Sequence, residues 1–374
     1  MGFQKSIYSS LACPKCLVIF EHDQLHNSLN CQNCYLEYPR IVVDNYEIID
    51  FISNDKDFTQ GFSIPDDNDN FKKLLQHFYQ SDFYSLLKAY ENIVSDKKID
   101  TTKQQNSIYR NISDYDLGHG KDSIKKVEQM CSSSSKYLDY NGFALENGSG
   151  LGYFTYEFSK KFEFLYIADC SLCYLLLAVK FVSQSQTMFN ESGLDKKILL
   201  IRCNSEKLPI KNNSINFIHS NQVIEHVSDQ LEYLKEMSRI TSEQSGLTYI
   251  VSPNRYSALK EPHYKLRFFG LYPKFIANFL IRNQNRTSDE VQPIGFIKLK
   301  EILKKSFFDN FHAVGIFSNL AIANPTRLKK LISAFARNKF FNYLFNKVII
   351  FIVPCHYVLA WKKIDEIEPV VKGS

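Results

Sequence analysis

The sequence predicts an α/β protein in which a small cysteine-rich module precedes a parallel sheet covered by helices on both faces. Two observations predict this architecture. Four cysteines form two C-x2-C pairs near the N-terminus, and after residue 140 apolar strand-like runs alternate with helical patterns. Such alternation is typical of a parallel sheet whose strands are connected by helices.

Composition is that of a folded protein, but the charge is unevenly distributed. The 374 residues are 44% hydrophobic and 23% charged, with a net charge of +5, which is ordinary for a globular chain. Residues 255–347 contain 17 Lys and Arg against 5 Asp and Glu, a local net charge of +12. A basic segment of this kind favours anionic partners such as nucleic acid, a phosphorylated substrate or lipid headgroups; a solvated basic face is the alternative.

The ends of the chain bear on its location. The opening residues, MGFQKSIYSS, lack the apolar stretch and cleavage site of a secretory signal, so we expect a reducing, cytoplasmic environment. The nearest approach to a membrane-spanning stretch, YLFNKVIIFIV (343–353), is interrupted by Lys347 and stopped by Pro354. It is shorter than the roughly 18 apolar residues that a membrane-spanning helix needs.

The first cysteine pair is Cys13 and Cys16, and the second is Cys31 and Cys34, with 14 residues between the pairs. Two such pairs can place four thiolates around one tetrahedral Zn²⁺, and four protein ligands close its coordination sphere. We therefore expect a structural zinc that folds the module and performs no chemistry. A disulfide pair or an empty site is the alternative.

The residues after the second pair, CQNCYLEYPRIVVDNYEIIDF, resemble the zinc-ribbon modules that precede or partner methyltransferase domains. Those modules usually carry a glycine after each C-x2-C, where this chain has Leu17 and Tyr35. We accordingly divide the chain into a zinc-ribbon module (1–55), a linker with capping helices (56–135) and a main domain (136–374) that contains a helical insertion at about 326–353. Within the linker, apolar residues recur at helical spacing over 71–94, and a second helix is expected over 122–131.

The main domain is expected to contain seven strands. The last strand is expected to run antiparallel into the sheet, and bound ligands are expected at the carboxyl ends of the parallel strands. The expected strands cover residues 142–146, 164–169, 198–203, 215–220, 247–252, 311–319 and 356–363, with helices over 150–161, 171–183 and 229–241.

The first strand leads into a glycine loop, LENGSGLG (145–152). It has no lysine where a phosphate-binding loop needs one, and its glycines lack the spacing of a dinucleotide fingerprint. The loop resembles the first motif, [D/E]-x-G-x-G-x-G, of class I S-adenosylmethionine-dependent methyltransferases. YIADCSLCYLLLAVK and CNSEKLPIKNNSINFIHSNQVIEHVSD follow in the order and spacing of that family. The resemblance covers roughly residues 115–255 and implies a Rossmann-like, seven-stranded methyltransferase sheet.

The resemblance also implies which residues bind S-adenosylmethionine. An acidic residue and three glycines would surround its amino-acid portion, the end of the second strand would border the ribose and adenine, and the segment after the third strand would line the adenine. The end of the fourth strand would face the departing methyl group. These positions are Glu146, Gly148, Gly150, Gly152, Asp169, Cys170, Asn204, Ser205, Glu206 and Asn221. Two of the loops depart from the family pattern, at Asn147 and at Asn204, which replaces an aspartate.

Three residues are candidates for acid or base chemistry on the acceptor. Some family members hold a divalent metal with E-x-x-E-H where this chain has Gln222, Glu225 and His226. Because a neutral amide is a poor ligand for a hard cation, we expect no metal here and treat His226 as a catalytic candidate or a hydrogen-bonding residue of the turn. The other candidates, Glu261 and His263, follow the fifth strand.

The segment SPNRYSALKEPHYKLRFFGLYP (252–273) contains both of these residues, together with Arg255, which could bind a phosphate or carboxylate. It resembles a segment of methyltransferases from glycan and surface-polysaccharide pathways. A purely structural role for Pro262 and His263 in shaping the loop is the alternative.

The sequence thus predicts methyl transfer from S-adenosylmethionine to a small-molecule acceptor, with a sugar or glycan-pathway intermediate as the leading hypothesis. An RNA methyltransferase is the first alternative, because zinc ribbons also precede certain ribosomal-RNA enzymes; few cations in the ribbon argue against it. A non-catalytic, cofactor-binding scaffold is the second. The basic, aromatic-rich stretch 327–353 suggests either a helical pair packed on the sheet or a peripheral contact with membrane.

Overall fold

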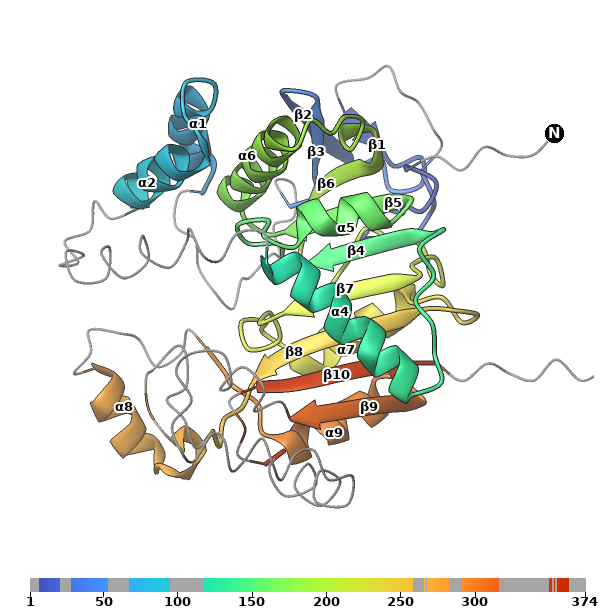
Figure 1. Cartoon of the computed structure of the whole chain (residues 1–374), viewed down its shortest axis with the longest axis vertical. Helices are drawn as coiled ribbons and strands as arrows, with labels where there is room; N and C mark the ends of the chain where they lie inside the picture. Colours follow the sequence, from blue (N-terminus) through green and yellow to red (C-terminus); the bar gives the residue numbers. More distant parts are fainter. Residues whose placement is uncertain are drawn as a thin grey trace, which may run out of the picture.

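Ten strands form one sheet, in the order β1-β2-β3-β6-β5-β4-β7-β8-β10-β9 (Figure 1). The computed structural model describes residues 7–20, 28–52, 67–94, 118–257, 266, 268–282, 291–315, 350–351, 353 and 355–362. The strands are β1 (Ser28–Asn30), β2 (Glu37–Val43), β3 (Tyr46–Asp50), β4 (Phe143–Asn147), β5 (Phe164–Asp169), β6 (Ile198–Arg202), β7 (Phe217–Asn221), β8 (Leu247–Pro253), β9 (Asn310–Gly315) and β10 (Cys355–Trp361).

The prediction of a seven-stranded sheet is wrong, because the N-terminal hairpin extends it. β2 and β3 pair antiparallel, and β3 then pairs parallel with β6, so that Ile48 lies opposite Leu200 and Asp50 opposite Arg202. Ile48 and Ile49 are fully buried. The edge strand β6 is therefore covered by the chain's own first module, which removes an exposed row of backbone donors and acceptors.

The remaining strands match the predicted alternation. β4, β5, β6, β7 and β8 are mutually parallel along the sheet, and their buried, nearly continuous apolar runs are what a two-sided parallel sheet requires. β10 runs antiparallel between β8 and β9, which confirms the prediction for the last strand. Most of the predicted helical insertion at 326–353 lies outside the described residues.

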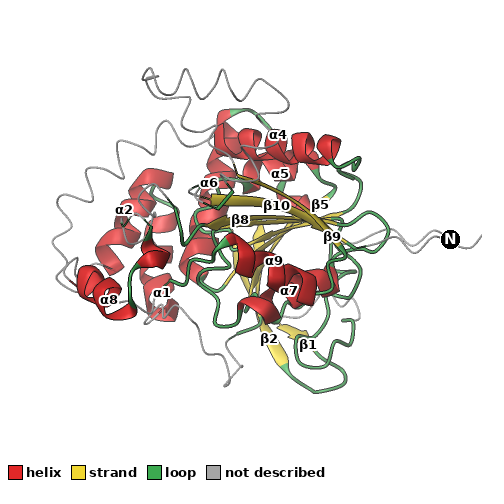
Figure 2. Cartoon of the chain, turned by 90° about the horizontal axis from the view of Figure 1, so that it is seen from below, coloured by secondary structure: helices red, strands yellow, loops and turns green. Residues whose placement is uncertain are grey.

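Helices cover both faces of the sheet (Figure 2). One face carries α4, α5 and α6, with α1 and α2 packed on α6; the other carries α7, α9 and the cysteine-bearing turns. The helices are α1 (Asp67–Phe78), α2 (Phe83–Val94), α4 (Gly118–Ser133), α5 (Thr155–Lys161), α6 (Leu172–Met188), α7 (Gln230–Ile240), α8 (Lys274–Arg282) and α9 (Phe296–Lys305), with short 3-10 turns η1 (Asp195–Lys197) and η2 (Phe269–Leu271).

The helical pattern predicted over 71–94 forms two helices. The break follows Phe78, and the carboxylate of Asp82 accepts a hydrogen bond of 2.7 Å from the backbone amide of Ser85 at the start of α2. An aspartate in this position satisfies an amide that the helix itself leaves unpaired. The two helices contact each other and α6, so the linker segment belongs to the same core as the sheet.

The carboxyl ends of the parallel strands meet at one edge of the sheet. In Figure 1 the arrowheads of β4 and β8 point toward this edge, and α1, α2 and α8 lie on the same side of the molecule. Open α/β sheets bind their ligands at such an edge. Among the described helices, none is long and apolar enough to cross a membrane.

Candidate functional site

The glycine loop after β4 folds tightly because two of its glycines have no room for a side chain. A Cβ atom on Gly148 would lie 2.3 Å from the Val223 side chain, and one on Gly152 would lie 2.7 Å from the Ala178 backbone in α6. Both glycines have positive φ, at 77° and 79°, a region that glycine alone adopts without strain. The loop is therefore held against α6 and the turn after β7.

Gly150, at the centre of the loop, has a different environment. It also has positive φ (50°), but nothing lies within 4 Å of where its Cβ would be. Its backbone amide donates a 2.9 Å hydrogen bond to Oδ2 of Asp169 at the end of β5, while Oδ1 accepts from the amide of Ser171. Burial raises the pKa of Asp169 to about 6, although these two hydrogen bonds favour the charged carboxylate and lower the pKa in part. The loop thus presents bare backbone beside a buried carboxyl group.

Glu146 lies beneath the loop and is fully buried. Its Oε2 accepts a 2.6 Å hydrogen bond from the hydroxyl of Thr155, the first residue of α5, whereas Oε1 has no hydrogen-bond partner. Burial raises the pKa of Glu146 to about 8; the Thr155 hydrogen bond opposes the shift, and nearby Asp169 adds to it. The side chain therefore retains hydrogen-bonding capacity that the protein does not use.

Asn147, the polar departure in the loop, fixes a neighbouring segment. Its Oδ1 accepts a 2.8 Å hydrogen bond from the hydroxyl of Ser205, which ties the segment after β6 to the end of β4. Its Nδ2 is buried without a partner, as is the hydroxyl of Ser149. Together with Oε1 of Glu146, three of the four residues 146–149 carry unpaired buried polar atoms, an unusual cluster that a bound polar ligand would satisfy.

The second departure, Asn204, also has a local structural role. Its Oδ1 accepts a 2.8 Å hydrogen bond from the amide of Glu206, which closes an Asx turn, and the Glu206 carboxylate accepts one of 2.6 Å from the amide of Asp229. Ser205 and Glu206 therefore use their side chains to hold the segment. Contacts from this segment to an adenine ring would come from its backbone and from the hydrogen-bonding capacity of its side chains that these bonds do not use.

Cys170 and Asn221 both stand at the carboxyl edge. Cys170 follows Asp169 directly, and burial raises the pKa of its thiol well above the usual value. Asn221 is the last residue of β7, half-buried, and is followed by Gln222 with a positive φ of 58°. The edge thus gathers the ends of β4, β5, β6 and β7, and with them all ten residues expected to bind the cofactor.

Backbone hydrogen bonds shape the turn after β7. Glu225 is buried and its carbonyl accepts a 2.7 Å hydrogen bond from the amide of Gln292, while the amide of His226 donates to the Val223 carbonyl. Across the described part of the chain, the one group of three or more candidate metal ligands is the cysteine cluster. His226 therefore has no ligand set around it there, and its role in chemistry stays a prediction.

The candidate substrate segment after β8 is described only in part. Asn254 is fully buried and its Nδ2 donates to the carbonyls of Phe351 and Val353, at 3.0 and 2.8 Å, which anchors the chain that leads into β10. The Arg255 guanidinium lies over the Phe269 ring, 5.1 Å from its centre. Glu261 and His263 lie outside the described residues, so the structure does not place them.

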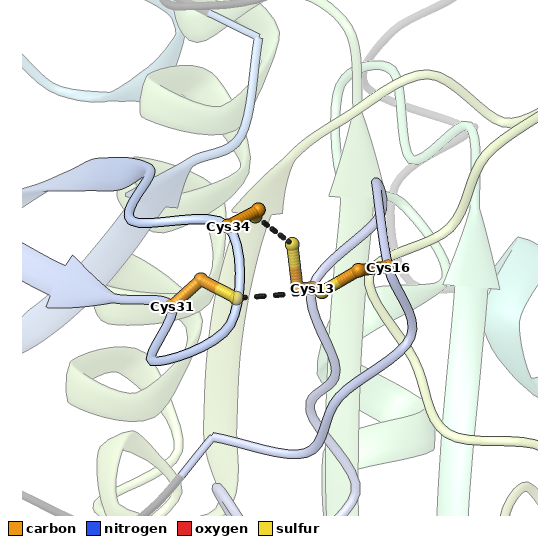
Figure 3. Close-up of side chains that lie close together, drawn as sticks. All are labelled: Cys13, Cys16, Cys31 and Cys34. Carbon is orange, nitrogen blue, oxygen red and sulfur yellow. Dashed lines mark hydrogen bonds between the residues drawn. The ribbon is translucent and has the colours of Figure 1, made fainter.

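The four cysteines of the first module converge on one point (Figure 3). The Sγ atoms of Cys13 and Cys34 are 3.5 Å apart, those of Cys16 and Cys31 are 3.4 Å apart, and all four lie within 4.8 Å of one another. Sulfurs about 2.3 Å from a tetrahedral zinc would be separated by about 3.8 Å. The hydroxyl of Tyr38, 3.2 Å from Sγ of Cys13, can donate to a thiolate there. The geometry fits a four-sulfur metal site.

Both cysteine turns adopt the shape that glycine would favour. Leu17 and Tyr35, the residues after each pair, have φ of 59° and 56°, and their amides donate to the carbonyls of Cys13 and Cys31. This left-handed backbone costs a side-chain-bearing residue about 1–2 kcal/mol. The absence of glycine therefore changes the energy of the turns and leaves their shape intact.

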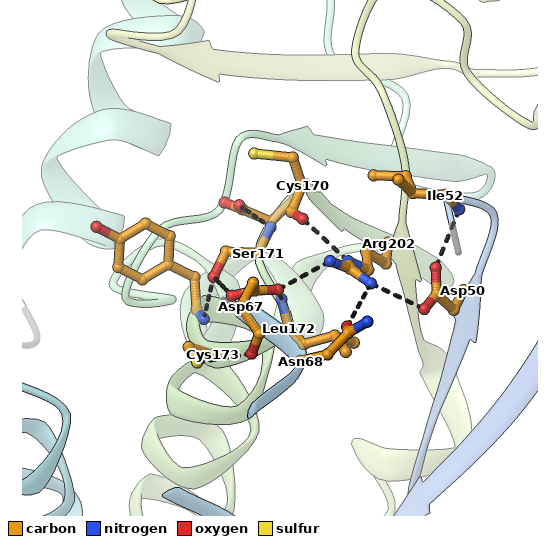
Figure 4. Close-up of polar contacts among 11 residues, drawn as sticks. Asp50, Ile52, Asp67, Asn68, Cys170, Ser171, Leu172, Cys173 and Arg202 are labelled. Atoms are coloured by element: carbon orange, nitrogen blue, oxygen red, sulfur yellow. Dashed lines mark hydrogen bonds and ion pairs between the residues drawn. The ribbon is translucent and has the colours of Figure 1, made fainter. Parts of the chain in front are cut away.

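Arg202 connects the first module, the linker helices and the carboxyl edge of the sheet, where the cofactor is expected to bind (Figure 4). We call this edge the cofactor edge. It ends β6, its side chain is 9% exposed, and its Nη1 donates to the carboxylate of Asp50 in β3 at 3.0 Å. Its Nη2 donates to Asp67, the first residue of α1, also at 3.0 Å. Its Nε donates to the carbonyl of Cys170, at 3.1 Å. One guanidinium thus satisfies groups from three parts of the chain.

Asp67 continues this network into α6. Its Oδ1 accepts from the Ser171 hydroxyl and its Oδ2 from the Leu172 amide, both at 2.8 Å, so a side chain from α1 caps the start of α6. A carboxylate at a helix N-terminus is stabilised by the unpaired amides and the helix dipole. The turn that begins at Asp169 is thereby fixed from both sides, by Arg202 and by Asp67.

The sequence analysis did not identify Arg202, Asp50 or Asp67 as important. A signal was present, because an arginine closes the apolar run ILLIRC and an aspartate closes EIID. Charged residues are almost never buried unless they are paired, but their partners are 135 and 152 positions apart in sequence. The parallel pairing of β3 with β6 brings Asp50 to Arg202, and the packing of α1 against α6 brings Asp67 there.

Comparison with known proteins assigns the central part of the chain. Residues 145–248 match the family model described as a methyltransferase domain. A search of curated proteins finds no match. The chain therefore carries a methyltransferase domain, which is an enzyme domain, around the glycine loop and the strands β4 to β8.

Among solved structures, the chain is similar to phosphoethanolamine N-methyltransferase 2 of Haemonchus contortus, with 13% identity and a TM-score of 0.40. The match covers 60% of this chain and only 50% of that one. It is also similar to an S-adenosylmethionine-dependent methyltransferase of Thermotoga maritima, with 15% identity and a TM-score of 0.40, over 70% of this chain and 98% of that one. Likenesses this distant assign no substrate.

Replacing Arg202 with methionine should strongly destabilise the protein. The change removes the guanidinium from two buried carboxylates, a loss that typically costs about 3–5 kcal/mol. Urea denaturation of the full chain measures it. Lys305→Met is the control, because the Lys305–Glu301 pair is solvent-exposed and such pairs contribute little to stability. Equal losses in the two variants would contradict the linking role of Arg202.

Proposed function

We propose that the chain transfers a methyl group from S-adenosylmethionine to a small-molecule acceptor, with a sugar or glycan-pathway intermediate as the leading candidate. The observation that carries the proposal is the glycine loop, where Gly150 presents open backbone beside Asp169 and three buried polar atoms lack partners. The match of residues 145–248 to a methyltransferase domain supports the same reaction.

In this mechanism the residues at the carboxyl edge of the sheet bind and orient the cofactor and the acceptor. Bound S-adenosylmethionine supplies a methyl group on a positively charged sulfur. Asp169 would accept hydrogen bonds from the two ribose hydroxyls, since a carboxylate can accept from both at once. The segment Asn204–Glu206, held by Asn147, would line the adenine. Alignment of the acceptor with the methyl group is the main catalytic contribution, worth up to about 7–11 kcal/mol in well-oriented systems.

An acceptor oxygen or nitrogen also needs a proton acceptor. Glu261 and His263 are proposed for that role, with His226 as a third candidate, because their segments follow the carboxyl ends of β8 and β7. A positioned general base typically contributes about 10²–10⁴ in rate. Arg255, held over the ring of Phe269, is proposed to bind an anionic group of the acceptor.

Cofactor binding is the first test. Calorimetry with the wild-type chain should show binding of S-adenosylmethionine, and Asp169→Asn should weaken it by about 10- to 100-fold, because two charge-assisted hydrogen bonds are weakened. Asp195→Asn is the control, since Asp195 lies in η1, before the opposite end of β6. Unchanged affinity in Asp169→Asn, with its thermal unfolding intact, would refute the assignment of the site.

The acceptor is tested with radiolabelled cofactor and fractionated cell extract. We expect label in a small or lipid-linked sugar with the wild-type chain, and much less with Asp169→Asn as the matched control, in line with its weaker cofactor binding. The basic stretch 255–347 favours RNA as the second candidate, so label in RNA would replace the sugar proposal. A chain that binds the cofactor and labels no fraction would favour the scaffold alternative.

We also propose that Cys13, Cys16, Cys31 and Cys34 hold one structural zinc ion. Elemental analysis of the purified chain should find about one zinc per molecule, and a strong chelator should lower the unfolding temperature, because metal-binding energy is folding energy in such modules. Cys31→Ser should lose the metal. Cys131→Ala is the control, since Cys131 is buried in α4, on the other face of the sheet from the four cysteines; metal loss in both variants would contradict the site.

A further inference from the structure

The two cysteine turns carry large apolar side chains that the protein leaves in solvent. Tyr35, after the second pair, is 87% exposed, and Leu17, Val18 and Ile19, after the first, are 44%, 40% and 43% exposed. The turns face each other across the cysteine cluster (Figure 3), whose sulfurs all lie within 4.8 Å of one another, so the four side chains come from adjoining turns. Large apolar side chains that gather in this way mark an interaction surface. We call these four residues the cysteine-turn patch.

Two residues of the patch occupy backbone positions that favour glycine. Leu17 and Tyr35 have φ of 59° and 56°, which costs a side-chain-bearing residue about 1–2 kcal/mol. Neither residue recovers this cost by packing deeply within the protein, because both are exposed. Strained backbone that a protein retains is typical of functional sites. The two side chains therefore present apolar surface at a cost to stability, which a binding role would explain.

The patch faces outward because the inner side of the module is already packed on the sheet. Phe20, Tyr38 and Phe51 are buried in the same core as the strands, and the ring centres of Tyr38 and Phe51 are 4.8 Å apart. A rotation of the module that buried the cysteine-turn patch would expose these three rings. A partner that covers the patch is therefore the way to remove it from water.

The charge of the two turns selects the partner. Among residues 13–20 and 31–37, which the structure describes, the charged side chains are Lys15 in the first turn and Glu37 after the second, and both are exposed. A patch with one charge of each sign has no net attraction for an anionic polymer or bilayer, and it does not repel a second copy of itself. In a twofold contact the same patch lies on both partners, so Lys15 of one copy can face Glu37 of the other.

We propose that two copies of this chain associate through the cysteine-turn patch, in a twofold contact whose main apolar anchors are Leu17 and Tyr35. A contact built on four apolar side chains lies at the small end of protein interfaces, so the dimer is weak and its population depends on concentration. The dimer is independent of the methyl-transfer reaction, because no residue of the patch belongs to the cofactor edge.

Sedimentation velocity of the full chain, at about 1 to 100 μM protein, tests the proposal. The wild-type mass should rise reversibly from 43.5 kDa toward twice that value. The double variant Leu17→Gly, Tyr35→Gly should associate about tenfold more weakly or less, since two apolar anchors are lost. Because glycine adopts the left-handed backbone without strain, the same variant should unfold at an equal or higher temperature.

Phe307→Gly is the matched control. Phe307 also has a positive φ, of 65°, and is 71% exposed, but it precedes β9, at the opposite end of the sheet from β1. The change removes the same kind of side chain from the same kind of backbone, so it should leave self-association unchanged. A salt concentration of about 0.5 M should preserve most of the association, because screening acts on charges and the contact is mainly apolar.

The remaining outcomes would overturn the proposal. A wild-type chain that stays monomeric over the whole concentration range contradicts it, as does a double variant that associates like the wild type or a Phe307→Gly variant that loses association. If the double variant unfolds more easily, Tyr35→Asn replaces it, since asparagine tolerates the left-handed backbone; unchanged association in Tyr35→Asn would then refute the patch. Calorimetry with S-adenosylmethionine on each variant distinguishes a failed dimer contact from a failed cofactor site.

Discussion

The buried guanidinium of Arg202 is the constraint on which the arrangement of this molecule depends. A buried charge is costly unless every donor is matched, and Arg202 finds its matches in Asp50 of β3, Asp67 of α1 and the carbonyl of Cys170. If any of these groups moved away, a donor of the buried guanidinium would lose its hydrogen-bond acceptor. The cysteine module, the linker helices and the cofactor edge are thereby fixed to one another at the turn that begins with Asp169.

This coupling explains why the first module is part of the sheet. The isoleucines of β3 extend the apolar layers of β6 on both faces, and Asp50 then stands opposite Arg202 in the strand register. A ribbon shifted by one residue would turn its buried side chains to the other face and would move Asp50 away from the guanidinium. Apolar pairing and the ion pair therefore select the same register.

Local patterns allowed much of the main domain to be predicted, and long-range pairing explains what was missed. The strands β4 to β8 and β10 are short, largely buried apolar runs, and such runs are read directly from the sequence. The extension by β1 to β3 was missed because nothing local in CQNCYLEYPRIVVDNYEIIDF shows that β3 pairs with β6. The break between α1 and α2 was missed because Asp82 was overlooked as a helix cap.

Two kinds of departure from family patterns have different physical meanings here. Leu17 and Tyr35 keep the left-handed turns that glycine would adopt without strain, so these two residues lower the free energy of unfolding of the module. Asn147 and Asn204 instead acquire new partners, Ser205 and the amide of Glu206, and these bonds hold the segment expected to line the adenine. The unpaired Nδ2 of Asn147 and Oε1 of Glu146 lie at the same end of β4 and leave hydrogen-bonding capacity that a bound polar ligand would satisfy, which is the basis for proposing a cofactor site here.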